Sequence, residues 1–317
     1  MIISLVLHGG GMTAEAVGMM AAGLATLGAG LVLVRSRFLD AVGAERVLVL
    51  GPVFEATAFA IFGAEHLLAA HDLMGIVPRW IPGPLFWTYF VGVAWMAAAI
   101  SLIAWRYVRW SAALLALALL IIVATIDLPN LPRHVHERLF WTLTARETAF
   151  AAGAMVLAGS VWPRGSATGG ALVWIGRVIV ALVSVFYAVE HFLFPLFVPG
   201  VPLNKPMPAW LPAPAVLSWA VGIVLLLGGI GLLVPRMVRG AAAASGSMLV
   251  LLTVFFYLPI LVMEIHTPLV IEGINYVGDT LLFGATVLLA GFAADRSWAV
   301  DEVAGREPAA LETASFR

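Results

Sequence analysis

The chain has 317 residues, of which 62% are hydrophobic and only 11% are charged, and its net charge is −1. A water-soluble domain needs more charge to cover its surface, so the excess of apolar side chains must face lipid. The near-neutral charge gives nucleic-acid binding no electrostatic basis, and the absence of cysteine excludes disulfides, thiolate metal ligands and catalytic cysteines within the chain.

The predicted elements are membrane-spanning helices, since a span needs about 20 apolar residues. We expect an all-α, polytopic membrane helix bundle with almost no soluble domain. The opening residues lack a basic region and a cleavage site, which predicts a short outer segment and no signal peptide. The nine predicted spans cover residues 15–34, 47–70, 87–105, 111–128, 144–162, 171–194, 215–234, 241–263 and 273–293.

Positive charge is divided unevenly between the two sets of connecting segments. One set, which includes the C-terminal tail, carries 12 of the 17 Lys and Arg residues, and the other carries 5. Cytoplasmic loops are enriched in Lys and Arg. The sequence therefore predicts a multi-pass protein of the cell (inner) membrane, with its N-terminus outside and its C-terminus in the cytoplasm.

Most of the chain is one four-helix unit written twice. Residues 51–66 align without gaps with residues 176–191, and the proline-rich loops at 78–84 and 208–214 also match. Each copy has an even number of spans, so both lie the same way up, which predicts a pseudo-two-fold axis along the membrane normal. The predicted units are an N-terminal helix and loop (1–46), repeat one (47–162), repeat two (163–293) and a polar tail (294–317).

Repeat two contains a Glu-His-Phe triplet at 190–192, a Pro-Trp loop at 208–214 and a Leu-Gly-Gly-Ile-Gly-Leu-Leu-Val-Pro-Arg turn at 227–236. These motifs resemble the DoxX-like family of small four-helix membrane proteins. Repeat one is similar at residues 65–66 and 78–84 but lacks the glycine-rich turn. The resemblance implies a four-helix membrane fold and, because the name-giving members belong to quinone-linked thiosulfate oxidation, a redox setting.

Two Glu-His pairs are predicted near the outer ends of the second and sixth spans. We expect Glu65, His66, Glu190 and His191 to line a shared site. Histidine can act as a proton acceptor near neutral pH, and two imidazoles can be axial ligands of haem or ligands of a metal ion. The alternative is that each histidine holds its helix end against a loop carbonyl.

Tryptophans follow both pairs in the Pro-Trp loops. Trp80 and Trp210 are candidates for covering a cofactor, although tryptophans at such places are more often interfacial anchors. His136 and His266 are further metal-ligand candidates, because each lies two residues from another polar group, and such residues share a face only in an extended segment. The alternative is a surface histidine in a loop.

Glu55 lies about eight residues into its predicted span, or roughly 12 Å at 1.5 Å per residue. Ionisable residues at such depth are candidates for function. We expect Glu55 to pair with Arg177 across the interface between the repeats, either as a structural ion pair or as the start of a proton path toward His66.

The sequence thus predicts a membrane subunit of a redox system, with a quinone, haem or metal ion in the outer half of the bundle. Membrane lipids and a redox protein are the expected partners. No phosphate-binding loop or dinucleotide motif is present, so nucleotides are not expected. The alternative is a non-catalytic scaffold or a module that binds a lipid or a partner. A transporter is disfavoured because the inner half has few polar residues for a through-path.

Overall fold

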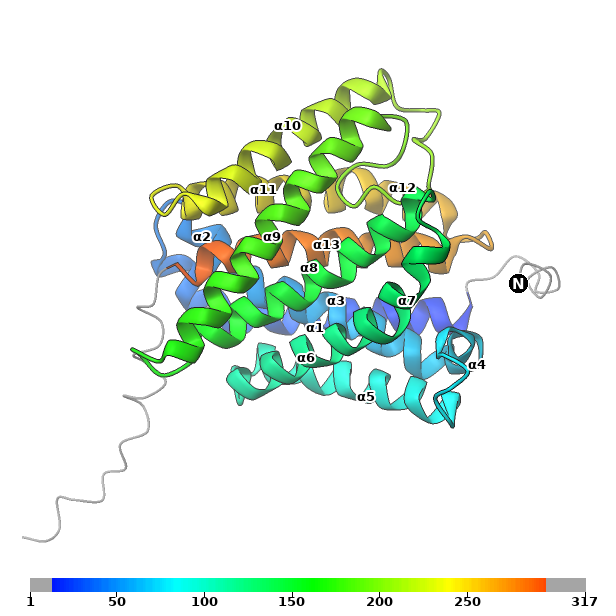
Figure 1. The fold of residues 1–317 in the computed structure, drawn as a ribbon, viewed down its shortest axis with the longest axis horizontal. Coiled ribbons are helices and arrows are strands. Elements are labelled where there is room, and N and C mark those ends of the chain that lie inside the picture. The colour runs from blue at the N-terminus through cyan, green and yellow to red at the C-terminus, as the bar shows by residue number, and fades with distance from the viewer. Residues whose placement is uncertain (1–12, 295–317) are drawn as a thin grey trace, which may run out of the picture.

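The computed structural model describes residues 13–294 as a bundle of long helices (Figure 1). Its only strand-like feature within that range is an isolated bridge between Phe197 and Pro206, so the predicted all-α class is confirmed. The segment with His8 and the polar tail after Ala294 lie outside the described residues. The principal helices are α1 (Ala14–Asp40), α2 (Glu45–Leu48), α3 (Gly51–Leu68), α4 (Ala70–Leu73), α5 (Pro84–Ile103), α6 (Val108–Ile122), α7 (Leu128–Asn130), α8 (Arg138–Ser160), α9 (Ala167–Leu193), α10 (Pro214–Leu233), α11 (Val238–Leu252), α12 (Leu258–Glu264) and α13 (Val270–Phe292).

All nine predicted spans are helical in the described part of the chain, and eight of the resulting helical segments are long and apolar enough to cross a membrane. The exception is α8. It has 23 residues, a sufficient length, but Arg138, Arg146 and Glu147 in its first half reduce its apolar character. These charges are shielded inside the bundle, because α8 packs against α6, α9 and α13.

The two halves contain helices of equal length in the same order. α5 and α10 have 20 residues each, α6 and α11 have 15, and α8 and α13 have 23. Their packing corresponds as well, because α3 packs against α5 and α13, while α9 packs against α10 and α8. This arrangement is the one expected for two parallel repeats, although the exact repeat boundaries stay a prediction.

Matching local features start and interrupt the paired helices. Pro84 and Pro214 begin α5 and α10, a position where the missing N–H costs no helical hydrogen bond. α6 and α11 each continue into a five-residue π-helical turn, Val123–Asp127 and Thr253–Tyr257, and Leu-Pro follows both turns. Proline cannot donate to the carbonyl four residues earlier, so a regular helix cannot run through this point unchanged.

The centre of the bundle consists of α3, α8 and α13, and the other long helices surround them (Figure 1). Within its most apolar stretch, α13 is 94% buried inside the protein, whereas α1 is 17% buried. The outer helices present large apolar side chains on their free faces, such as Leu24, Phe90, Leu114 and Leu227. Such faces fit contact with lipid acyl chains.

One end of the bundle carries every histidine of the described residues. We call it the histidine end; α4, α7 and α12 lie there (Figure 1). Its histidines are His66, His71, His134, His136, His191 and His266.

Candidate functional site

A cavity of about 520 Å³ lies in repeat one at the histidine end. Its walls come from α3, α5, α8 and α13, from the end of α6 with its π turn, and from the loop after α4. The lining is mostly aliphatic and aromatic. The polar and charged side chains that line it are Glu65, His66, Thr88, Thr125, Asp127, Asn130, Arg146, Glu147, Asn275 and Asp279. A pocket with apolar walls and a few converging polar groups is the usual form of a small-molecule site.

One ring nitrogen of His66 forms a hydrogen bond within the protein. Its Nδ1 lies 2.8 Å from the carbonyl oxygen of Phe62. A carbonyl only accepts, so Nδ1 carries the hydrogen and donates it. Trp95 packs edge-on against the imidazole at 4.6 Å between ring centroids. Gly92 allows α5 this close approach, because a Cβ there would lie 3.0 Å from the Cβ of His66.

Glu65 is buried beside His66 and is tied to the other repeat. Asn275 on α13 donates to Glu65 Oε1 at 2.7 Å. The second oxygen, Oε2, has no hydrogen-bond donor within the described residues. The carboxyl group is thus fixed by one oxygen, and the residue still lines the cavity.

An ion-pair network lies next to this pair, where α8 meets α13. Arg146 donates to Asp279 Oδ2 and to Glu147 Oε1, each at 2.7 Å. Asp279 is 3% exposed. All three residues line the cavity, so its polar end contains two carboxylates and one guanidinium that compensate each other in part.

The corresponding Glu-His pair of repeat two is closed off by the chain itself. His191 is 1% exposed. Its Nδ1 donates to the carbonyl of Tyr187 at 2.5 Å, and its Nε2 accepts the backbone N–H of Gly200 at 2.9 Å. Both ring nitrogens are therefore used within the protein, as the structural alternative for this histidine predicts.

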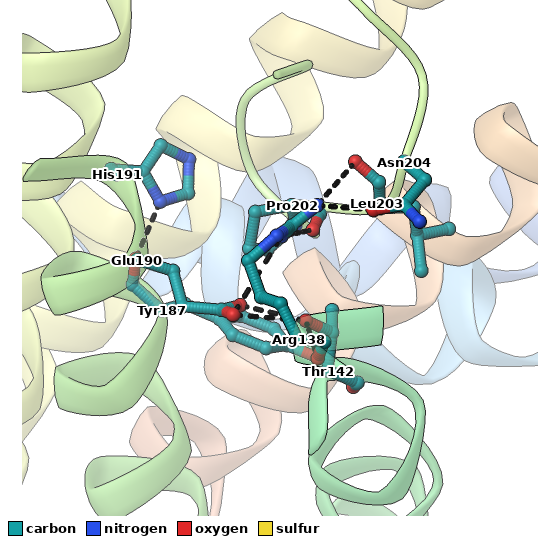
Figure 2. A network of polar contacts seen from close by, with 8 residues as sticks. All are labelled: Arg138, Thr142, Tyr187, Glu190, His191, Pro202, Leu203 and Asn204. Carbon is teal, nitrogen blue, oxygen red and sulfur yellow. Dashed lines mark hydrogen bonds and ion pairs between the residues drawn. The ribbon is translucent and has the colours of Figure 1, made fainter. Parts of the chain in front are cut away.

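Glu190 is also fully engaged (Figure 2). It accepts the hydroxyl of Thr142 at 2.9–3.0 Å and lies 3.6 Å from the guanidinium of Arg138. Arg138 in turn donates to the carbonyl oxygens of Pro202 and Leu203, and to the side chain of Asn204. The charged pair fastens the loop after α9 to α8.

The length of that loop explains why the two repeats differ. Pro78 follows His66 by 12 positions, whereas Pro208 follows His191 by 17. The longer loop places residues 198–203, all of them buried, over His191. Gly200 lies at the centre with φ +96°, a conformation that favours glycine. We call residues 198–203 the plug.

The other predicted ligand residues do not join the cavity. Trp80 and Trp210 are exposed by 70% and 47%, and the indoles that line the cavity belong to Trp87 and Trp95. His136 and His266 are exposed in loops. Among residues 13–294, no three His, Asp or Glu side chains form a group that could hold a metal ion. Since His191 uses both nitrogens, it has none left to join His66 as a second ligand of haem or metal.

The predicted ion pair between Glu55 and Arg177 is wrong. Glu55 is 0% exposed, and neither of its carboxyl oxygens has a hydrogen-bond partner among residues 13–294. The reason is the packing: α3, which carries Glu55, contacts α13, and α9, which carries Arg177, contacts α8, so α8 and α13 separate the two residues. Glu55 does not line the cavity either, and no hydrogen bond of the described residues links it toward His66.

Sequence reasoning did not select Arg146, Asp279, Asn275 or Trp95 as site residues. Two of them gave a usable signal. Arg146 and Asp279 fall inside predicted spans, and ionisable residues in a span are functional candidates unless shown otherwise. Asn275 and Trp95 gave none, because the sequence does not show which helix faces which.

Comparison with known proteins gives a partial family match and no activity. A family model described as a domain of unknown function, DUF8561, matches residues 56–151. This stretch runs from within α3 to within α8 and includes Glu65, His66 and Arg146. No curated protein and no solved structure matches the chain. The resemblance to the DoxX-like family stays a prediction.

Proposed function

We propose that this protein is the membrane subunit of a quinone-linked redox system and binds a lipid-soluble quinone or quinol in the cavity of repeat one. The observation that carries the proposal is the cavity itself, which combines apolar walls with Glu65 and His66 at one polar end. Apolar walls suit a quinone ring and its tail, and the polar end suits its oxygen atoms.

The site has groups that can hold such a head and take up protons. His66 Nε2 is a free acceptor, because Nδ1 donates to Phe62. Glu65 offers Oε2 beside it, since Asn275 occupies only Oε1. A bound quinol supplies two electrons and two protons on oxidation, and imidazole and carboxyl groups are the usual proton acceptors in proteins. We propose that a partner redox protein accepts the two electrons.

The histidine end is proposed to face outward. The opposite end carries the larger share of Arg residues, and the cytoplasmic side of membrane proteins is the more positive one. Protons released at Glu65 and His66 would then leave on the outer side of the cell membrane. In this account the Glu190–His191 pair is structural.

The first test identifies the molecule that copurifies with the protein. We expect an organic extract of detergent-purified protein to contain quinone or quinol in near-equal amount to the chain. The double variant Glu65→Gln/His66→Leu should retain at least about tenfold less, because each lost hydrogen-bonding group weakens binding by about 1 kcal/mol or more. Mass spectrometry of the extract measures both.

The matched control is His71→Gln, which changes an exposed histidine of the same end and should keep the quinone. An extract with only phospholipid, in equal amount from all three proteins, would contradict the proposal and favour a scaffold that binds lipid.

A further inference from the structure

The polar groups of the cavity are unequally used. Most of its side-chain donors are engaged: the indole of Trp87, the hydroxyls of Thr88 and Thr125, and the amide of Asn130 donate to main-chain carbonyls. Arg146 donates to carboxylates through its two terminal nitrogens, while its Nε has no partner within the described residues. The indole Nε1 of Trp95 is buried with no partner among the described residues.

Three acceptors are left over as well. His66 Nε2 has no partner within the described residues, and neither has Glu65 Oε2. Asp127 lines the same cavity, and its Oδ2 is buried without a donor. A buried acceptor that loses water without gaining a donor costs free energy, so a ligand that fills this cavity has to bring donors.

The second repeat shows what such a partner looks like. At His191 the Nδ1 hydrogen goes to a carbonyl four residues earlier, as it does at His66. The Nε2 atom there receives the N–H of Gly200, whose neighbours in the plug are buried and apolar. The plug is thus an apolar body that presents one hydrogen-bond donor to the imidazole.

From this correspondence we infer that the cavity of repeat one selects ligands that donate a hydrogen bond to His66 Nε2, so that it binds the quinol in preference to the quinone. A quinol has hydroxyl groups that donate, whereas a quinone carbonyl only accepts and would face the lone pair of Nε2. The inference rests on the proposed function and adds to it the redox state that the site recognises.

The test compares three ligands that share one body: a decyl-substituted 1,4-hydroquinone, the matching quinone, and the dimethyl ether of the hydroquinone. Binding to ligand-stripped protein is measured by thermophoresis in detergent, without oxygen, at pH 8, where the imidazole is neutral. We expect the hydroquinone to bind at least about tenfold more tightly than the other two, because only it satisfies Nε2.

Variants identify the atom responsible. The preference should disappear in His66→Leu and also in His66→Gln, whose amide can turn either its donor or its acceptor to the ligand, and it should persist in His71→Gln. Equal affinities of the three ligands for the native protein would overturn the inference and leave the proposed function standing. A preference that survives both His66 variants would overturn it too. Binding of none of the three would refute the proposed function along with it.

Discussion

Replacement of Arg146 by Met is expected to lower the free energy of unfolding by about 3–5 kcal/mol, the usual cost of removing one partner of a buried ion pair. Arg146 compensates Asp279 and Glu147 at 2.7 Å each, and Asp279 is 3% exposed. Without the guanidinium, a carboxylate stays buried between α8 and α13 with no cation. Denaturation by SDS in mixed micelles, followed by circular dichroism, measures the loss.

Two further variants distinguish the loss of the buried ion pair from a general effect of mutation. Arg79→Met, at an exposed loop position, should change stability by about 0.5 kcal/mol or less. The double variant Arg146→Met/Asp279→Leu should be more stable than Arg146→Met alone, because it also removes the orphaned charge. If the double variant is less stable than Arg146→Met, Asp279 stabilises the fold by some interaction other than its ion pair with Arg146.

The second large effect is an asymmetry between the two histidines. His191→Leu should cost about 1–3 kcal/mol, the penalty for a buried N–H left without an acceptor, here that of Gly200. His66→Leu should cost less, since no N–H or O–H of the protein donates to His66 in the described structure. The same SDS titration compares both variants with the native chain.

This comparison has a built-in control, because the two substitutions are chemically identical and occupy corresponding helix ends. Ligand binding should respond in the opposite order: binding of the hydroquinone should be weaker in His66→Leu and unchanged in the folded fraction of His191→Leu. Equal losses of stability in the two variants would contradict the view that His191 is structural because the plug donates a hydrogen bond to it.

The fold was largely predictable from the sequence, for a physical reason. Membrane helices satisfy their own backbone hydrogen bonds, so a run of apolar residues determines both the element and its extent. The predicted 273–293 and the observed Val270–Phe292 differ by a few residues at most. The internal match of 51–66 with 176–191 likewise anticipated paired helices with equivalent packing.

The site was less predictable, because it depends on which side chains meet across helices. The Glu-His motif drew attention to Glu65 and His66, which line the cavity, but the same motif in repeat two is buried and bonded within the chain. The difference comes from five extra residues in the loop after His191, and the Glu-His motif itself is the same in both repeats. The error at Glu55 has the same origin, since the alignment suggested a contact that α8 and α13 prevent.

The central claim is that the duplicated bundle has one open site, in repeat one, and one site closed by its own chain. The natural sequence has no cysteine, so single cysteines report on access directly. Val91 and Val221 are the eighth residues of α5 and α10; Val91 lines the cavity, and Val221 is 3% exposed.

The most direct measurement is the rate at which N-ethylmaleimide labels Val91→Cys and Val221→Cys in the purified protein. We predict that Val91→Cys reacts at least about tenfold faster, because a residue enclosed by protein reacts only when the structure opens locally. Decyl hydroquinone should slow the labelling of Val91→Cys and leave that of Val221→Cys unchanged. Equal rates at the two positions, with no protection by the hydroquinone, would contradict the account.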